Sequence, residues 1–332
     1  MELDNTSIQE RKNTKISYLK GGSGQRLPMV IIPESDKKLD KYFAENVEAI
    51  RNELHKTGAI LFRGWEVDSA EDFFQVISNL SKKSIDYVQR TSPRSEVIQK
   101  VYTSTDYPSD QEIKPHNESS YASVYPLYIG FYCLIQPQQG GETPITDNRA
   151  MVSKLSDNTR RLFKENGINY TRNMLEWLGL SWQEVYQTDN KGKVEQLLSN
   201  DGMEYEWVDD SHLRVKWYRK AFQIHPINGD KVWFNHSYFY HRQNLDPNLL
   251  NLVDRKDMPF YVRFGDHSEI GDDIFNELKE AYDDATIIFK WQKGDILLLD
   301  NMLFSHARKP FKGERKILVS MAEPQSYTLN AQ

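Results

Sequence analysis

The sequence predicts a mainly β fold, a β-barrel or jelly roll that carries a few helices. Short strand-like runs recur along the 332 residues, most densely in the last third. Amphipathic helical patterns accompany them near the N-terminus and in the middle of the chain. The sequence also lacks the glycine-rich turn between a strand and a helix that dinucleotide-binding and P-loop folds require. Together these observations favour a β core decorated with helices over a nucleotide-binding fold.

The N-terminal part predicts two helices and a strand between them. Residues 39–56 have apolar side chains at spacings of three and four, which is typical of an amphipathic helix: Leu39, Phe43, Val47, Ile50 and Leu54. Residues 59–64 form a short apolar run that predicts a strand. A second helix is expected over residues 69–80, because Ser69 is a good N-cap and the acidic Asp72 lies in the first turn.

Further along the chain, a helix that starts at Asp147 or Asn148 is expected to carry Met151, Leu155 and Leu162. The apolar run at residues 128–135 predicts a strand. The last third returns to strands, which we expect at residues 287–291, 295–299 and 316–321.

Between residues 170 and 285 the pattern loosens, and helical pieces alternate with strand-like ones. The helical pieces are residues 181–187 and 273–281, and the strand-like ones are 213–217 and 231–234. Binding loops commonly lie on such irregular regions. We therefore expect a single domain over residues 1–332, with residues 1–36 as an N-terminal extension and residues 170–285 as a lid and substrate insertion.

Composition limits the classes of partner. The formal net charge is −6, so no basic field would attract nucleic acid or an anionic membrane. Apolar runs stop short of the roughly 20 residues that span a bilayer, and the polar start lacks a secretory signal. The single cysteine, Cys133, lies in an apolar run and predicts a buried thiol in a reducing compartment. We expect a cytoplasmic protein without nucleic-acid or membrane partners.

Two His-x-Glu triplets are candidates for metal binding, at His116–Glu118 and His267–Glu269. Chance alone would produce roughly one His-x-acid triplet in a chain of this composition. On an extended segment, residues i and i+2 point to the same face, so the first pair can converge on one ion. The second triplet lies in a polar, glycine-bearing stretch that predicts a surface turn, and we expect it to bind no metal. An ordinary hydrogen-bonded pair is the alternative for His116 and Glu118.

A third candidate ligand, His306, follows the buried run at residues 294–301. Two imidazoles and one carboxylate are the ligands of mononuclear non-heme iron enzymes, in which other coordination positions stay open. We interpret His116, Glu118 and His306 as such a site. A zinc hydrolase would use the same ligands, and a histidine that bonds a backbone carbonyl is the alternative for His306.

These residues and their surroundings resemble the taurine dioxygenase-like superfamily of Fe(II)- and 2-oxoglutarate-dependent oxygenases, in its clavaminate synthase-like branch. The resemblance runs from about Ala59 to Pro324, and three segments carry it: Pro115-His116-Asn117-Glu118, Gln139-Gly140-Gly141-Glu142-Thr143-Pro144, and the stretch from Asn301 to Val319. It implies a double-stranded β-helix (jelly-roll) core with flanking helices and a helical, irregular lid insertion.

The resemblance also implies roles for particular residues. His116, Glu118 and His306 would be the catalytic iron ligands, and Thr143 would hydrogen-bond the carboxylate of the co-substrate 2-oxoglutarate. Arg315, nine residues after His306, would bind the distal carboxylate, since a guanidinium can hold a carboxylate through two parallel hydrogen bonds. Some relatives carry this arginine where the chain has Ser320, so Arg308 is the alternative anchor.

The reaction implied by the resemblance consumes O2 and 2-oxoglutarate and oxidises an unactivated C–H bond. Related halogenases lack the carboxylate ligand, so Glu118 implies hydroxylation, or desaturation as the alternative. The substrate implied is an amino acid or its derivative, either free or tethered to a carrier protein, in a natural-product pathway. A non-catalytic jelly-roll binding protein is the remaining alternative.

Candidate substrate residues are those near the proposed metal and those in the irregular region. Asn117 and Tyr121 lie close to the first ligand pair, and Asn235 follows two aromatic residues, Trp233 and Phe234. Plain core packing is the alternative for the two aromatic residues. Three further histidines have spacings that match no metal site, and we interpret them as structural or substrate-side residues: His225, His236 and His241.

Overall fold

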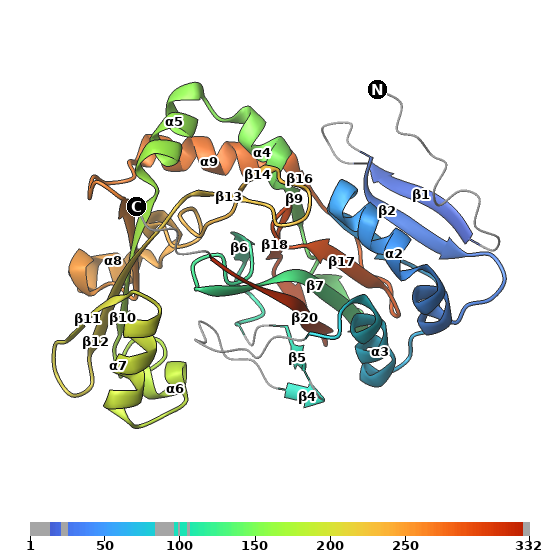
Figure 1. Ribbon diagram of the computed structural model, residues 1–332, viewed down its shortest axis with the longest axis horizontal. Helices are drawn as coiled ribbons and strands as arrows, with labels where there is room; N and C mark the ends of the chain where they lie inside the picture. The colour runs from blue at the N-terminus through green and yellow to red at the C-terminus, as the bar shows by residue number, and fades with distance from the viewer. Residues whose placement is uncertain (1–13, 21–25, 84–95, 99, 105–106, 328–332) are drawn as a thin grey trace.

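The computed structural model of the chain describes residues 14–20, 26–83, 96–98, 100–104 and 107–327. A sandwich of two β-sheets occupies its middle, and a mixed part of helices and strands, residues 148–285, extends along one side of it (Figure 1). We call this second region the outer part. No helix among the described residues is both long and apolar enough to cross a membrane.

The larger sheet of the sandwich has eight strands. In spatial order they are β1 (Thr14–Lys20), β2 (Arg26–Pro33), β3 (Ala59–Phe62), β17 (Ile296–Asp300), β7 (Val124–Ile135), β20 (Lys316–Ser326), β5 (Val101–Thr103) and β4 (Glu96–Ile98). Every pair is antiparallel except β2 with β3. The described residues of the predicted N-terminal extension therefore include two strands that lengthen this sheet, and residues 1–13 and 21–25 lie outside the described residues.

The smaller sheet has four strands and faces the larger one. Its order is β16 (Thr286–Ile287), β9 (Ile145–Asp147), β18 (Phe304–Arg308) and β6 (Ile113–His116). Side chains from both sheets share one hydrophobic core, in which Phe304 of β18 joins Ile129 of β7 and Leu298 of β17. A separate two-stranded antiparallel sheet is formed by β8 (Gln139–Gly140) and β19 (Phe311–Lys312). The predicted jelly-roll core is confirmed.

Two N-terminal helices cover the larger sheet, α2 (Leu39–Thr57) and α3 (Ala70–Leu80) (Figure 1). Helix α3 begins as predicted: the Ser69 side chain accepts a hydrogen bond from the Asp72 backbone, and the Asp72 carboxylate accepts one from the Ser69 backbone. Helix α2 ends at Gly58, whose φ of 84° suits a glycine. Both helices bury their apolar faces against the sandwich.

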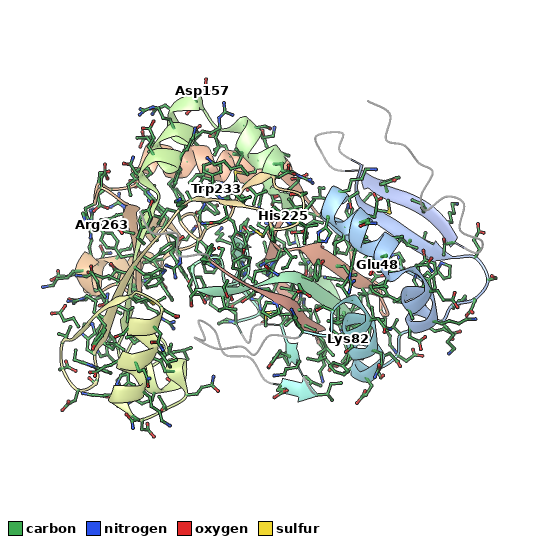
Figure 2. All side chains as sticks on the ribbon, viewed as in Figure 1. Glu48, Lys82, Asp157, His225, Trp233 and Arg263 are labelled. Carbon is green, nitrogen blue, oxygen red and sulfur yellow. The ribbon has the colours of Figure 1, made fainter. Side chains whose placement is uncertain are left out.

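The outer part has a sheet and a core of its own. The sheet order is β11 (Glu204–Trp207), β12 (Leu213–Arg219), β10 (Ile168–Met174) and β15 (Phe260–Phe264). Around it lie α4 (Asn148–Lys154), α5 (Asp157–Asn166), α6 (Trp182–Tyr186), α7 (Lys191–Asn200), α8 (Pro247–Leu252), α9 (Asp272–Ala285) and the hairpin of β13 (Phe222–Ile224) with β14 (Lys231–Trp233). The hairpin residues His225 and Trp233 lie deep inside the molecule, whereas Asp157 lies at its periphery (Figure 2).

Two expected elements differ from the structure, and other elements were missed. The helix from residue 147 is two helices, because Leu155 and Ser156 are extended and the Ser156 side chain caps α5 at the Thr159 amide. The strand expected at residues 287–291 stops at Ile287, the last residue that pairs with β9. Periodicity also missed β10, β11, β15 and α7; in β10 the apolar pattern is broken by polar residues that are themselves buried, Thr171, Arg172 and Asn173.

Cys133 is buried in β7, as predicted. Burial raises the pKa of its thiol to about 12, so the thiolate is scarce at neutral pH.

Candidate active site

His116, Glu118 and His306 come together where the two strands β6 and β18 meet. His116 and His306 are paired residues of the antiparallel ladder, and their ring centres are 4.4 Å apart. Glu118 follows β6 by two residues. One potential ligand atom from each of the three lies within 4.8 Å of the others, and Glu118 and His306 are buried. The sequence suggested that His306 lies just past the end of the preceding strand. In the structure it lies inside a short strand of its own, β18.

The orientation of His116 is set by its own strand. Its Nδ1 atom lies 2.9 Å from the backbone carbonyl of Lys114 and donates a hydrogen bond to it. Nε2 is then left as the ligand atom, an arrangement usual for metal-bound histidine. Two imidazoles and one carboxylate on adjoining backbone therefore fit a ferrous ion chemically.

A set of buried asparagines holds the backbone around Glu118 in place. The Asn301 side chain accepts a hydrogen bond from the Glu118 amide (2.8 Å) and donates one to the Glu118 carbonyl (2.9 Å). Asn117 donates to the carbonyls of Asn301 (2.6 Å) and Phe304 (2.9 Å). Asn148 donates to the carbonyl of Met302 (3.1 Å). The turn between β17 and β18 is thus tied to Asn117 and to the backbone of Glu118.

Asn117, expected as a substrate residue, is completely buried in this network. It does not line the larger of the two cavities beside His116. Sequence reasoning missed Asn148 and the function of Asn301. The signal was an Asp300-Asn301 pair at the end of a fully buried strand, where a polar side chain must find backbone partners.

A small cavity adjoins His116 and His306 and contains the residues expected to hold the co-substrate. Thr143, Arg308 and Arg315 all line it. The Thr143 hydroxyl accepts a hydrogen bond from the Trp291 indole (3.0 Å), so its own proton can point elsewhere. Burial, followed by the neighbouring Arg308, lowers the pKa of Arg315 to about 10, and the guanidinium therefore keeps its charge at neutral pH.

The two arginines of this cavity differ in what they already bind. Arg308 donates three hydrogen bonds to backbone carbonyls, those of Tyr107 (2.9 Å), Pro108 (2.5 Å) and Gln111 (2.8 Å). Arg315 donates to the Gly141 carbonyl (2.9 Å) and to the Ser104 hydroxyl (3.1 Å). Arg308 is therefore engaged mainly in holding the loop at residues 107–111.

The double glycine before Thr143 makes room for Arg315. Gly141 has a φ of 70°, and a Cβ atom there would lie 2.9 Å from Cδ of Arg315 and 3.0 Å from Cβ of Phe311. Both the backbone conformation and the close approach require a glycine.

A larger cavity of about 360 Å³ opens on the other side of His116. Tyr121 lines it, as expected for a substrate residue, together with His236 and Arg172. Asn235, by contrast, is not among its lining residues: its amide donates to the Ala221 carbonyl (3.0 Å) and its oxygen accepts from Ser237. Trp233 and Phe234 pack in the two hydrophobic cores instead of lining the cavity.

The other histidines separate into distinct settings. His236 lies beside the site, with its Nδ1 atom 2.6 Å from the Ser120 hydroxyl; burial, and then the nearby His116, holds its pKa well below the usual value. His241 lies 2.9 Å from the carbonyl of Ile270 through Nε2 and serves the outer core. His267 occupies an exposed turn with a φ of 70° and belongs to neither group of metal-type ligands among the described residues.

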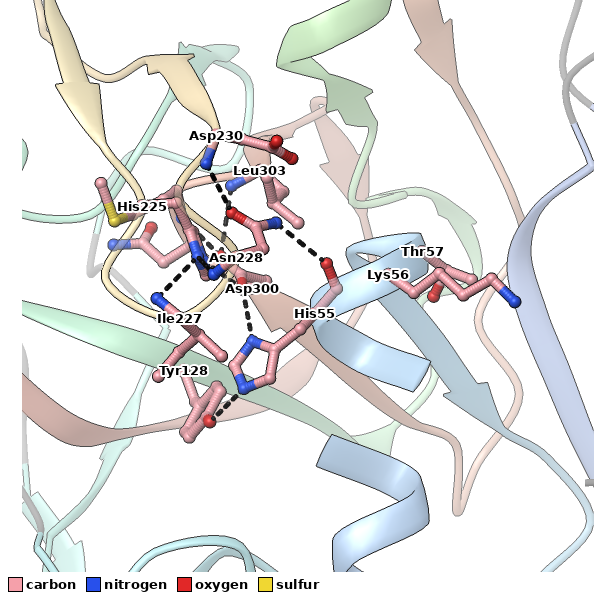
Figure 3. Close-up of polar contacts among 12 residues, drawn as sticks. His55, Lys56, Thr57, Tyr128, His225, Ile227, Asn228, Asp230, Asp300 and Leu303 are labelled. Carbon is pink, nitrogen blue, oxygen red and sulfur yellow. Dashed lines mark hydrogen bonds and ion pairs between the residues drawn. The ribbon is translucent and has the colours of Figure 1, made fainter. Parts of the chain in front are cut away.

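A second buried group of metal-type ligands comprises His55 of α2, Asp300 of β17 and His225 after β13 (Figure 3). His225 Nδ1 lies within 3.3 Å of the amides of Ile227 and Asn228, which donate to it, so its Nε2 carries the proton and donates to Asp300 (2.8 Å). His55 lies 3.2 Å from the same carboxylate oxygen. With imidazole protons directed at the carboxylate, this group is a hydrogen-bond network joining three parts of the fold.

Comparisons with known proteins identify the family of the chain. The family model "Taurine catabolism dioxygenase TauD, TfdA family" matches residues 25–321. The chain is 36% identical over 300 residues to the dapdiamide synthesis protein DdaC of Enterobacter agglomerans, covering 89% of the chain and 91% of the relative. It is 32% identical over 281 residues to a clavaminate synthase-like protein of Arabidopsis thaliana, with 81% and 83% covered.

Among solved structures, the PvcB protein of Pseudomonas aeruginosa has a similar fold. The TM-score is 0.56 at 12% identity, with 93% of this chain and 91% of PvcB covered. A second PvcB structure is described as that of an Fe, alpha-ketoglutarate dependent oxygenase from an isonitrile synthetic pathway. The chain belongs to the TauD/TfdA dioxygenase family and is an Fe(II)- and 2-oxoglutarate-dependent dioxygenase.

Proposed function

We propose that the enzyme hydroxylates an unactivated C–H bond of an amino acid or an amino-acid-derived small molecule in a biosynthetic pathway. The observation that carries this proposal is the position of Glu118, which completes a group of two imidazoles and one carboxylate at the edge of a 360 Å³ cavity. The names of two similar proteins support the biosynthetic part, since DdaC is named for dapdiamide synthesis and PvcB for an isonitrile pathway.

In this proposal, His116, Glu118 and His306 hold Fe(II), which together with 2-oxoglutarate supplies the oxygen-activating chemistry when bound. The contribution of the protein is to place the reacting groups and to exclude water. The asparagine network keeps Glu118 in position through both of its backbone polar groups. His116 lines both cavities, so the co-substrate in the smaller one and the substrate in the larger one would both lie beside this residue.

Co-substrate binding is assigned to Thr143 and Arg315. The Thr143 hydroxyl already accepts a hydrogen bond from Trp291 and can donate its proton to a carboxylate. Arg315 offers a charged, planar guanidinium on the wall of the same small cavity. Three backbone carbonyls occupy Arg308, which supports Arg315 as the anchor and Arg308 as the residue that shapes the cavity.

The proposal is tested by incubating the enzyme with Fe(II), 2-oxoglutarate and O2 and a panel of amino acids and their derivatives. Hydroxylation predicts that succinate forms in proportion to a product that has gained one oxygen atom. Loss of two hydrogen atoms from the product would instead identify a desaturase. Absence of succinate under all these conditions, with intact iron binding, would favour a binding protein. Zinc in the purified protein and hydrolysis without 2-oxoglutarate would favour a hydrolase.

A further inference from the structure

We propose that Arg172 binds a carboxylate of the primary substrate, so that the enzyme acts on a free acid and not on an acid joined to a carrier through that group. This inference rests on the proposed function, because it assigns the larger cavity to the substrate. It decides between the free and tethered substrates that the sequence left open.

The two cavities beside the metal site each have an arginine of their own. The smaller cavity contains Arg315, which is the proposed anchor of 2-oxoglutarate. The larger cavity is lined by His116 and Glu118 and also by Arg172 of β10. A second anionic group bound near the metal would therefore meet a separate cation, and the two carboxylic acids would not compete for one arginine.

Arg172 is held in a fixed setting. Only 7% of the residue is exposed, although its side chain lines the cavity. Its guanidinium lies over the Phe260 ring, 5.2 Å from the ring centre. Phe260 in turn stacks on Tyr240 with ring centres 3.9 Å apart and planes inclined by 3°. Because this aromatic support restricts the planar group, less entropy is lost when it binds a ligand through both arms.

The other charges of the cavity wall do not oppose an anion. Glu112 is bracketed by two ammonium groups, with Lys114 at 2.6 Å and Lys309 at 2.5 Å. Burial alone would raise the pKa of Glu112, but the hydrogen bonds from the two lysines outweigh it and lower the pKa. Lys114 lines the larger cavity together with Glu112, whereas Lys309 is not among the lining residues. Glu112 and Lys114 therefore balance on the cavity wall, and with Glu118 committed to the metal in the proposed function the net positive charge of the wall is that of Arg172.

A free carboxylate and its carbonyl derivatives differ sharply at such a site. A carboxylate presents two charged oxygens that match the guanidinium fork. A carboxamide, an ester or a thioester keeps only one carbonyl acceptor and no charge. Truncating one partner of a buried, hydrogen-bonded charge pair usually costs at least about 30-fold in affinity. The structure therefore predicts strong selection for the acid.

The test is calorimetric binding to the anaerobic enzyme loaded with Fe(II) and 2-oxoglutarate. The probes are the L-amino acids, their N-acetyl derivatives and the matching primary carboxamides. Acids that bind should do so at least about 30-fold more tightly than their carboxamides. Arg172→Gln should remove this difference, and Arg172→Lys should restore only part of it because an ammonium lacks the fork.

Arg219→Gln is the matched control, because Arg219 is equally buried at 7% and lies on the neighbouring strand β12 but does not line the cavity. It should leave the preference for acids unchanged. If Arg172→Gln fails to fold, the comparison of acids with carboxamides on the wild-type enzyme still tests whether the enzyme selects free acids. Equal binding of acids and carboxamides, binding of no acid, or loss of the preference only in the Arg219 variant would each overturn the proposal.

Succinate formation, measured on the same samples, separates this inference from the proposed function. Turnover without preference for acids would refute the role of Arg172 and leave the oxygenase assignment intact. A preference for acids that depends on Arg172, without succinate formation, would support the binding site and refute the proposed reaction. Turnover that requires an aminoacyl carrier protein, with no binding of the free acids, would show that the substrate is tethered.

Discussion

His116 and His306 are direct cross-strand partners on β6 and β18, with ring centres 4.4 Å apart. The pairing of the two strands therefore sets the distance between the two proposed metal ligands, and Glu118 completes the group through the chain that leaves β6. A sheet register is a rigid way to hold two imidazoles, since a shift by one residue would turn one ring to the opposite face.

Replacing either histidine should abolish turnover. We expect His116→Ala and His306→Ala each to lose Fe(II) binding and succinate formation, because two remaining ligands cannot hold the ion in place. Metal content and succinate release measure the two effects. His267→Ala is the control, since His267 lies in an exposed turn away from this group. Loss of activity in the control together with an active His116 variant would refute the ligand assignment.

Arg315→Ala should raise the KM for 2-oxoglutarate by at least about 30-fold, because a buried charge-assisted contact is lost. Arg308→Ala should mainly lower stability, since three backbone carbonyls would lose their hydrogen-bond donor. Steady-state kinetics and thermal unfolding of both variants distinguish the two roles. The assignment is reversed if the Arg308 variant shows the large KM effect and the Arg315 variant does not.

Gly141→Ala should also weaken 2-oxoglutarate binding, because the added methyl group would press on the Arg315 side chain at 2.9 Å. We expect a loss of about 1–3 kcal/mol of stability as well, from overpacking. Gly202→Ala separates the two causes: Gly202 has a similar φ of 65°, but its added Cβ would meet nothing within 4 Å. A KM effect of equal size in both variants would show that backbone strain, and not contact with Arg315, is responsible.

Asp300→Asn should destabilise the fold by on the order of 3 kcal/mol at pH 7, because it breaks a buried network. One carboxylate oxygen accepts from His225 and His55, and the other from the amides of Met302 and Leu303. A carboxamide has one acceptor oxygen, so one pair of donors would face an NH2 group. Asp157→Asn, with an exposed side chain, should change stability by less than about 0.5 kcal/mol.

The stabilisation from Asp300 should depend on pH. Burial alone would raise its pKa, but the hydrogen bonds from His225 and His55 outweigh burial and lower the pKa in the folded state. A group whose pKa is lowered by folding stabilises the protein above its unfolded pKa of about 3.9, and loses this effect as the pH falls through the folded pKa. The difference between wild type and Asp300→Asn should therefore shrink below about pH 4 in denaturant titrations. A difference that stays constant down to lower pH would contradict this account.

The sequence by itself determined the elements whose signals are local. The apolar spacing of α2, the Ser69 and Asp72 cap of α3 and the buried run of β17 depend on neighbours in the chain, so periodicity and capping reveal them. The His116–Glu118 pair, the double glycine before Thr143 and the spacing of Arg315 after His306 were equally visible as short motifs.

Only the tertiary structure decided which polar residues face the substrate. Asn117 lies between two proposed ligands in sequence and Asn235 follows two aromatic residues, yet backbone carbonyls bind their amides and neither lines the larger cavity. Arg172 comes from β10, a strand that periodicity missed, and the fold places it on the wall of the same cavity as His116 of β6. The physical reason is that a hydrogen bond or a cavity wall joins residues far apart in the chain, and their pairing depends on how whole sheets pack.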